Sequence, residues 1–196
     1  MSRYNNDEVV VVTAIIWWLR YKICYNERGS RFDPFFCLCL DEFIRVLIAG
    51  DVYDKSIPSE AATVLLDFFL CELAKLKVNT FMISGNHDSD DRLNYGSSLF
   101  ESNRIFISAV YNGSLYKQTV TDEFGELDVY LLPFVKASQV RRFFPEEEIR
   151  SYEDAVKIIL DHAQIDKKRR NVLVAHQFVC GKGGDPECAG SEGASV

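Results

Sequence analysis

The chain has 196 residues, a hydrophobic content of 47%, a formal net charge of −7 and an isoelectric point near 5.0. This length fits one domain, and the hydrophobic content is ordinary for a globular protein. The acidic balance argues against non-specific affinity for nucleic acid over the whole surface, because Lys and Arg contacts to phosphate dominate such affinity. It does not exclude a local basic groove. The dense basic run at residues 167–170 is interpreted as a solvated connection between a helix and a strand.

The cysteines and the first apolar run indicate in which cellular compartment the protein is expected. None of the six cysteines has zinc-finger spacing, since Cys37 and Cys39 are closer than a Cys-x-x-Cys pair. Cys71 falls in an apolar helical pattern and is predicted to be a small core residue. Residues 9–19 are strongly apolar but too short to span a bilayer, and they lack a signal-peptide cleavage site. We therefore expect free thiols in a reducing cytoplasm, and no membrane partner.

The sequence divides into three parts. Residues 1–43 hold both tryptophans and show little periodicity, so they are predicted to be a divergent segment in which residues 9–15 form a first strand. Residues 44–180 alternate strand-like and helix-like patterns and are predicted to be the core domain. Residues 181–196 are rich in glycine, a composition that predicts a disordered tail.

The core begins with a strand, a helix and a second strand. Residues 44–49 are a continuous apolar run, as expected for a strand that is buried on both faces. Ser59 is a suitable N-cap for the helix that follows. Apolar residues at helical spacing predict its core face: Ala61, Leu65, Phe68, Phe69, Leu73 and Leu76. Residues 78–84 form the next predicted strand.

The second half of the core is predicted to be mostly sheet. Short alternating runs at residues 105–110, 115–120 and 127–132, with turns at Gly113 and Gly125, indicate neighbouring sheet strands. Ser151 and Asp154 resemble a capping arrangement for a helix that extends to about His162, which is interpreted as a packing or surface residue. Residues 171–175 form a last predicted strand.

Three of these predicted strands end in polar side chains that suit a metal. Residues 50–54 read Gly-Asp-Val-Tyr-Asp, residues 85–88 read Gly-Asn-His-Asp, and a third strand ends in His176. Ligands of open α/β sheets bind outside the carboxyl ends of the strands. Carboxylate, amide and imidazole together suit a divalent ion of the Mn, Zn or Fe type. Asp51, Asn86 and His176 are therefore the candidate metal ligands.

These segments resemble the calcineurin-like metallophosphoesterases and, within them, the SbcD-type (Mre-like) exonucleases. The resemblance covers residues 44–180, and its most specific stretches are residues 47–58, 83–89 and 174–179. An Asp-Ser-x-x-Arg-Leu extension at residues 88–93 and a His-Gln-Phe-Val stretch after the third strand narrow it to the nuclease branch. The resemblance implies an α/β fold, a layered β-sandwich flanked by helices, here incomplete at both ends.

The resemblance also implies a metal site. In this superfamily two metal ions about 3.5–4 Å apart clamp a phosphodiester. Asp51 resembles the carboxylate that bridges both ions, and Asn86 and His176 resemble ligands of the second ion. The family's Asp-x-His pair and its Gly-His-x-His pair are missing from this sequence, which has three histidines in total. We therefore expect at most one ion here, with Mn²⁺ as the predicted metal, and a poor nuclease.

Three further residues receive roles from the resemblance. His87 resembles the residue that contacts the scissile phosphate and protonates the leaving 3′ oxygen. Asp88 is expected to orient His87, as hydrogen-bonded partners of functional histidines often do. Arg92 matches a family position and is a candidate substrate contact, although a structural role is equally compatible with the sequence.

The implied reaction is metal-dependent hydrolysis of DNA phosphodiester bonds in DNA repair and recombination. It is exonucleolytic on duplex ends and endonucleolytic on single strands or hairpins. The implied partners are DNA, an SbcC-type ATPase and, in the intact family, a second copy of the same protein. Two alternatives stay open: a phosphoesterase that acts on a small phosphodiester or phosphomonoester, and a catalytically inactive fragment or scaffold of the same fold.

Overall fold

A computed structural model describes the backbone at residues 10–12 and the chain from residue 45 to residue 177. Within these residues the strands form two sheets, of order β1-β7-β6-β5 and β2-β3-β4. The strands are β1 (Val10–Val12), β2 (Arg45–Ala49), β3 (Asn79–Ile83), β4 (Ile105–Ser108), β5 (Tyr116–Asp122), β6 (Gly125–Leu132) and β7 (Arg170–Ala175). The helices are α2 (Glu60–Lys75), α3 (Asp90–Asn94), α4 (Ser97–Glu101), α5 (Ala137–Val140) and α6 (Tyr152–His162).

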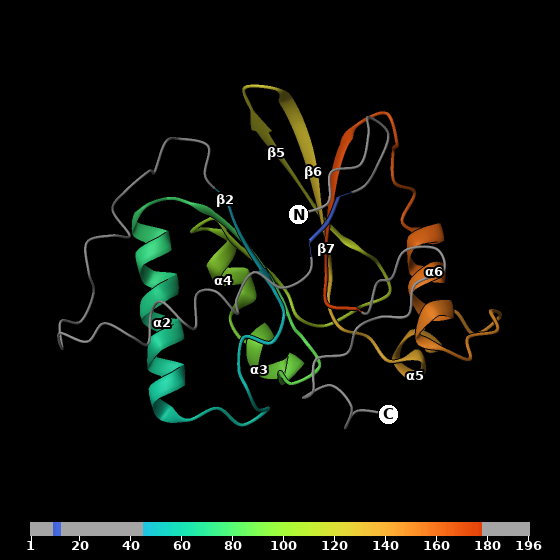
Figure 1. The fold of residues 1–196 in the computed structure, drawn as a ribbon, viewed down its shortest axis with the longest axis horizontal. Coiled ribbons are helices and arrows are strands. Elements are labelled where there is room, and N and C mark those ends of the chain that lie inside the picture. The colour runs from blue at the N-terminus through green and yellow to red at the C-terminus, as the bar shows by residue number, and fades with distance from the viewer. Residues whose placement is uncertain (1–9, 13–44, 178–196) are drawn as a thin grey trace.

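The two sheets pack face to face, and helices cover their outer faces (Figure 1). Between the sheets lies an apolar layer to which Phe81 of β3 and Val129 of β6 contribute. Met82 of β3 belongs to a second cluster with residues of α2 and α3. Tyr130 of β6 belongs to a third, with residues of α5 and α6. This arrangement confirms the predicted layered α/β sandwich flanked by helices.

The layers explain why the central strands are apolar without alternation. Successive side chains of a strand point to opposite faces of its sheet. In β3, Phe81 and Ile83 face the other sheet, while Met82 between them faces the helices. Each of these three side chains is at most 1% exposed. A strand covered on both sides therefore requires a continuous apolar run. The strands predicted at residues 44–49, 78–84 and 171–175 match β2, β3 and β7.

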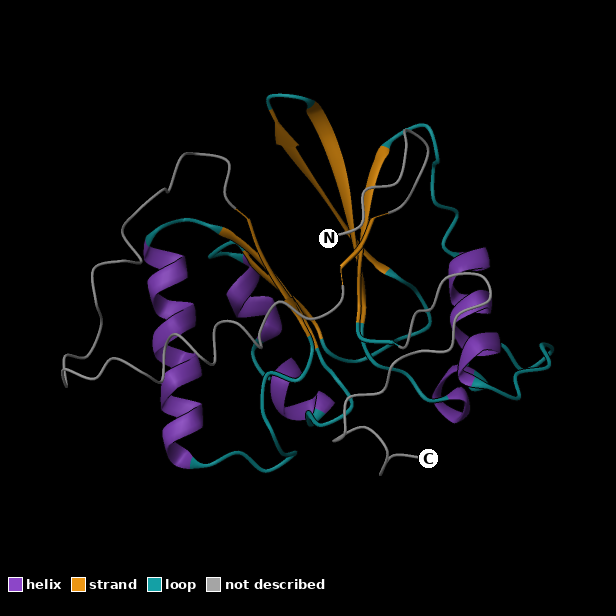
Figure 2. Cartoon of the chain, in the orientation of Figure 1, coloured by secondary structure: helices purple, strands orange, loops and turns teal. Residues whose placement is uncertain are grey.

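Parallel pairing brings several strand ends to one edge of the sandwich. β2, β3 and β4 pair in parallel, and β7 pairs in parallel with both β1 and β6. β5 and β6 form an antiparallel hairpin that turns at Gly125, whose φ is +102°. Figure 2 shows the strands gathered between the two groups of helices. The carboxyl ends of β2, β3 and β7 thus lie together, opposite the tip of the hairpin (Figure 1).

Both predicted helix caps are present. Ser59 Oγ accepts a hydrogen bond of 3.2 Å from the amide of Ala62 at the start of α2. At the start of α6, Ser151 Oγ accepts from the amide of Asp154, whose carboxylate accepts from the amide of Ser151 in return. These bonds satisfy amides that the first turn of a helix leaves without partners.

The structure differs from the sequence prediction in one strand pairing and in three short helices. Of the three runs between residues 105 and 132, β5 and β6 are neighbours as predicted, but β4 pairs with β3 in the other sheet. Short alternating runs do not show which sheet a strand joins. The short helices α3, α4 and α5 were not predicted, because helices of four or five residues carry too little periodicity to recognise.

The predicted core face of α2 is also partly wrong. Leu65, Phe68 and Leu76 are 39%, 38% and 44% exposed, and Cys71 is exposed rather than a core residue. The side chains that pack against the sheet are Leu66, Phe69, Leu70, Leu73 and Ala74. This helix is apolar over more than one face, so the pattern alone did not fix its rotation about its axis.

Residues 1–9, 13–44 and 178–196 lie outside the described residues, and the predictions for the divergent segment and the Gly-rich tail fall largely there. The described part of the predicted first strand is β1, which pairs in parallel with β7 at the edge of its sheet. Among the helices of the described residues, none combines the length and the apolar character that a membrane crossing requires.

Candidate active site

A left-handed turn places Asp51 over the end of β3. Gly50 and Asp51 follow β2 directly and have φ values of +83° and +48°. Positive φ is uncommon for residues other than glycine, although Asp tolerates it better than most. The turn brings Asp51 Oδ1 to 3.2 Å from the amide of His87, which follows β3. The ends of two parallel strands are thereby joined through the candidate ligand itself.

Two glycines allow this close approach. A Cβ on Gly85 would lie 2.2 Å from Asp51 Oδ1, and a Cβ on Gly50 would lie 2.6 Å from Nδ1 of His176. Real Cβ atoms do not come so close to other atoms. Any side chain at either position would therefore displace a candidate ligand. This explains why both motifs have glycine at these positions.

The three candidate ligands meet around one point. His176 Nε2 lies 3.0 Å from Asn86 Oδ1 and 3.4 Å from Asp51 Oδ1. Ligands that share one ion at 2.0–2.2 Å are separated by about 2.8–3.1 Å at right angles and about 3.3–3.6 Å at tetrahedral angles. The two observed distances fall in these ranges. The distances from His176 Nε2 to both oxygens therefore fit candidate ligands that share one divalent cation.

The tautomer of His176 supports the same conclusion. Its Nδ1 donates a hydrogen bond of 2.8 Å to the carbonyl oxygen of Ala49, the last residue of β2. Nε2 then faces two oxygens, both of them acceptors as placed. A lone pair among acceptors needs a positive charge between them, either a proton or a metal cation. Metal-bound histidines commonly donate their other N–H to a backbone carbonyl in this way.

The pKa values of the site follow from these contacts. Burial by itself raises the pKa of Asp51, but the hydrogen bond and charge of His176 and the His87 amide outweigh it, so the pKa lies below its usual value. Burial lowers the pKa of His176, but hydrogen bonds to Asp51 and to the Ala49 carbonyl outweigh it, so this pKa lies above its usual value. The same atoms can thus hold a proton or a divalent cation, and metal binding releases the proton.

His87 lies beside this cluster with one ring nitrogen fixed. Its Nδ1 donates to the carbonyl oxygen of Asp54 at 3.1 Å, and its backbone amide bonds to Asp51. The ring is partly exposed. With Nδ1 as the donor, Nε2 is the nitrogen left to exchange a proton with a bound molecule. This geometry suits a general acid or base at the rim of a metal site.

Asp88 does not make the contact with the His87 ring that the sequence suggested. Its carboxylate accepts three backbone hydrogen bonds, from Val52 at 3.0 Å, Tyr53 at 2.8 Å and Gly85 at 2.8 Å. The Asp54 carbonyl orients the ring instead. Asp88 is 7% exposed, and its side chain points back between the two loops. The expectation that Asp88 orients His87 is therefore corrected.

Two other side chains border the site. Arg92 lies in α3 with an exposed side chain. Phe134, just after β6, packs edge-on to His176 with ring centroids 6.4 Å apart, and its amide bonds to the carbonyl of Ser84 at 3.0 Å. Sequence reasoning missed Phe134 and the carbonyls of Ala49 and Asp54. Backbone acceptors carry no sequence signal, and a Phe after an apolar strand is indistinguishable from core.

The candidate ligands in the described residues are few. The described residues contain no group of three or more His, Cys, Asp or Glu side chains placed to share a metal. The cluster consists of Asp51 and His176 with an amide, Asn86, as the third candidate ligand. The roles of these side chains as metal ligands, and of His87 in catalysis, stay predictions that the contacts support.

Comparison with known proteins gives a consistent assignment. The family model described as Calcineurin-like phosphoesterase matches residues 42–188. The chain is 36% identical over 141 residues to a Staphylococcus epidermidis protein named as the D subunit of the nuclease SbcCD, a match that covers 69% of this chain and 36% of that protein. It is 34% identical over 154 residues to the Staphylococcus saprophyticus protein of the same name, a match that covers 72% of this chain and 40% of that protein. The chain thus spans well under half the length of these relatives.

Proposed function

This chain belongs to the calcineurin-like phosphoesterase family, and from that premise we propose that it is a nuclease of the SbcD type. Its reaction would be the metal-dependent hydrolysis of phosphodiester bonds in DNA. The observation that carries the proposal is the meeting of Asp51 Oδ1, Asn86 Oδ1 and His176 Nε2 around one point. These three atoms lie at the edge of the sandwich where parallel strands end, the usual position of ligands in open α/β sheets.

Members of this family use divalent metals, and we propose Mn²⁺ as the ion held by Asp51, Asn86 and His176. A mixed set of carboxylate, amide and imidazole suits such an ion better than Mg²⁺ or Ca²⁺, which prefer oxygen alone. When bound, the ion supplies Lewis-acid polarisation of a phosphate oxygen. The protein supplies the fixed separation of the ligands, because Gly50 and Gly85 let the three loops approach closely.

His87 is the proposed general acid. Its Nδ1 is held by the Asp54 carbonyl at 3.1 Å, which leaves Nε2 to carry the proton. That proton would pass to the oxygen that leaves the phosphorus, so that the departing strand ends in a hydroxyl. The backbone bond from the His87 amide to Asp51 keeps the ring next to the metal ligands during this transfer.

DNA is favoured over a small phosphoester by two features. Residues 88–93 carry the Asp-Ser-x-x-Arg-Leu stretch, and Arg92 is exposed on α3, where its guanidinium can reach a phosphate. The relatives are named as parts of a nuclease, SbcCD. By that likeness we also propose an SbcC-type ATPase as the partner, with repair and recombination of DNA as the setting.

The test compares two substrates with this 196-residue chain. End-labelled duplex and hairpin DNA, and in parallel a small chromogenic phosphodiester, are incubated with Mn²⁺ and separately with a chelator. We expect Mn²⁺-dependent cleavage of DNA that is lost in Asp51→Asn and retained in His162→Ala, whose ring packs on Phe144 away from the ligands. Because the family's Asp-x-His and Gly-His-x-His pairs are missing from the sequence, the rate should be low and one Mn²⁺ should bind per chain.

The other outcomes separate the alternatives. Hydrolysis of the chromogenic diester without cleavage of DNA would favour a phosphoesterase for small substrates. Mn²⁺ binding without hydrolysis of either substrate would indicate an inactive relative or scaffold. Two tight Mn²⁺ sites per chain would mean that residues outside the described part complete the site, and the carboxylates Asp33 and Asp41 would be the first to replace.

A further inference from the structure

One buried carboxylate connects the two loops that carry the candidate ligands. Asp88 Oδ2 accepts hydrogen bonds from the amides of Val52, at 3.0 Å, and Gly85, at 2.8 Å, while Oδ1 accepts from the amide of Tyr53 at 2.8 Å. Val52 follows Asp51 in the first loop, and Gly85 precedes Asn86 in the second. One side chain therefore fixes the backbone next to two of the three ligands.

We propose that Asp88 is a positioning residue that preforms the metal site by holding these two loops at a fixed separation. The proposal rests on the metal site of the proposed function. It gives Asp88 a role in metal affinity, through Asp51 and Asn86, rather than in the orientation of His87. The left-handed turn at Asp51 needs such support, because a positive φ outside glycine persists only where the surroundings impose it.

A carboxylate is the only side chain of this size that satisfies all three donors. Three N–H groups converge on two oxygens, both of which must accept. An asparagine would offer one oxygen and one NH₂ group, so at least one backbone N–H would face another N–H. A buried donor left without an acceptor is costly, and the loops would be expected to move apart to rehydrate it.

The negative charge of Asp88 supports the same role. The donors that its carboxylate accepts from are all neutral amides, and none of the ion pairs found in the described residues includes it. When Asp88 is ionised, its charge therefore adds to that of Asp51 at the strand ends. A divalent cation is attracted by both carboxylates, although only Asp51 would bind it.

The test uses Asp88→Asn with Asp128→Asn as its matched control. Asp128 is also a buried aspartate that accepts several hydrogen bonds, but it lies at the far end of the sandwich. Mn²⁺ affinity is measured by calorimetry without DNA, and amide hydrogen exchange is followed by NMR without metal. We expect Mn²⁺ to bind about 10–100-fold more weakly to Asp88→Asn, the usual range for residues behind a metal ligand, and with unchanged affinity to Asp128→Asn.

The NMR measurements separate positioning from other roles. In Asp88→Asn the amides of Val52, Tyr53 and Gly85 should exchange faster, while the ¹⁵N shifts of the His87 ring should stay unchanged because Asp54 holds it. In the unaltered chain these three amides should be protected before Mn²⁺ is added. This last measurement does not depend on the folding of any variant.

Three results would overturn the proposal. Equal Mn²⁺ affinity in Asp88→Asn and the unaltered chain would remove Asp88 from the metal site. Protection of the three amides that develops only after Mn²⁺ is added would show that the metal, not Asp88, orders the loops. A changed His87 ring without a change in affinity would restore the orienting role. Absence of Mn²⁺ binding by the unaltered chain would instead overturn the proposed function itself.

Discussion

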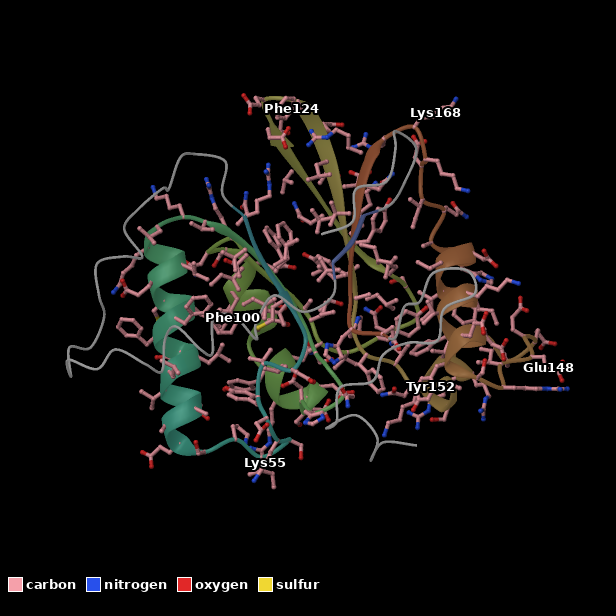
Figure 3. All side chains as sticks on the ribbon, in the orientation of Figure 1. Lys55, Phe100, Phe124, Glu148, Tyr152 and Lys168 are labelled. Atoms are coloured by element: carbon pink, nitrogen blue, oxygen red, sulfur yellow. The ribbon has the colours of Figure 1, made fainter. Side chains whose placement is uncertain are left out.

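Two buried aspartates at opposite ends of the sandwich are satisfied in different ways. Asp88, at the carboxyl ends of the strands, is bonded to backbone amides alone. The Asp128 side chain, in β6, is fully buried and accepts two hydrogen bonds from Arg169, at 2.8 and 2.9 Å, and contacts Lys117 at 2.7 Å. Figure 3 labels Phe124 and Lys168 at this second end and Lys55 at the first.

The pKa values of the two carboxyls move in opposite directions as a result. Burial raises the pKa of Asp88, and the three amides do not offset it fully. Burial also acts on Asp128, but Arg169, Lys117 and Thr119 outweigh it and hold its pKa well below the usual value. The cationic partners neutralise one end, where the contacts serve stability. At the other end, Asp88 accepts only from backbone amides, so burial acts on its carboxylate without a cationic partner among the residues that the structure describes.

Chain topology explains where each arrangement lies. Parallel strands end together at the carboxyl edge and leave backbone amides of the following loops without ladder partners. At the opposite end, Lys117 on the neighbouring strand β5 and Arg169, just before β7, lie beside Asp128 of β6. Cross-strand pairing of opposite charges is a common way to stabilise a sheet. The comparison predicts that substitutions at the two ends affect different measurements.

The largest effect is expected at the carboxyl edge, on the rate of the reaction. If the chain cleaves DNA, His87→Ala should slow the chemical step by about 10²–10⁴-fold, because a positioned acid or base contributes that much. Mn²⁺ affinity by calorimetry should change little, since His87 is not a proposed ligand. Single-turnover cleavage measures the step, with His162→Ala as the histidine control. Loss of Mn²⁺ from His87→Ala would show that His87 is itself a ligand.

The next effect is expected at the opposite end, on stability. Asp128→Asn should lower the free energy of unfolding by about 3 kcal/mol, the low end of the range for a broken buried ion pair. The low end applies because Arg169 and Lys117 are 34% and 42% exposed and can be hydrated. Urea denaturation measures the free energy of unfolding of both proteins. A change in Mn²⁺ affinity in this variant would contradict the separation of the two ends.

The pH dependence of that stability difference has a definite sign. The folded-state pKa of Asp128 is depressed, so its contribution is fully present above the unfolded-state pKa of about 3.9 and is lost as pH falls through the folded value. The difference in unfolding free energy between the unaltered chain and Asp128→Asn should therefore be constant near pH 7 and shrink below about pH 4. A difference that grows on acidification would have the wrong sign.

Substitution of one glycine at each end of the sandwich should give smaller effects than the aspartate and histidine variants. In Gly85→Ala the new Cβ would lie 2.2 Å from Asp51 Oδ1, so Mn²⁺ affinity should fall by about tenfold or more as the ligand is displaced. In Gly125→Ala the new Cβ would meet no atom within 4 Å, but residue 125 has a φ of +102°, which strains any residue other than glycine. Stability should therefore fall while Mn²⁺ affinity stays unchanged. Calorimetry and thermal unfolding of both variants measure this. Equal Mn²⁺ affinity in the two would mean that the loops adjust freely.

The smallest effect concerns Arg92, the proposed phosphate contact on α3. Arg92→Ala should weaken DNA binding equally for all sequences and reduce the slope of log affinity against log salt concentration by about one. Mn²⁺ affinity should not change. Fluorescence anisotropy over a range of salt concentrations measures the slope, and Lys168→Ala, at the other end of the molecule (Figure 3), is the control. An unchanged slope would assign Arg92 a structural role.

Much of the fold was readable in the sequence because its signals are local. The apolar runs of β2, β3 and β7, the Ser59 cap and the capping box at Ser151 each depend on residues a few positions apart. The identities of Asp51, Asn86 and His176 as polar residues after apolar strands were visible in the same way. The exposed side of α2 was not, because an apolar helix offers more than one face to a sheet.

Tertiary structure alone decided how those parts meet. The bond from His176 to the Ala49 carbonyl joins residues 127 positions apart, and Asp88 reaches amides 35 and 36 positions earlier in the chain. The division of β4 and β5 between two sheets is equally non-local. Sequence patterns encode which residues are buried and which are polar. They do not encode which backbone N–H or C=O a side chain will find, since every residue but proline offers the same two groups.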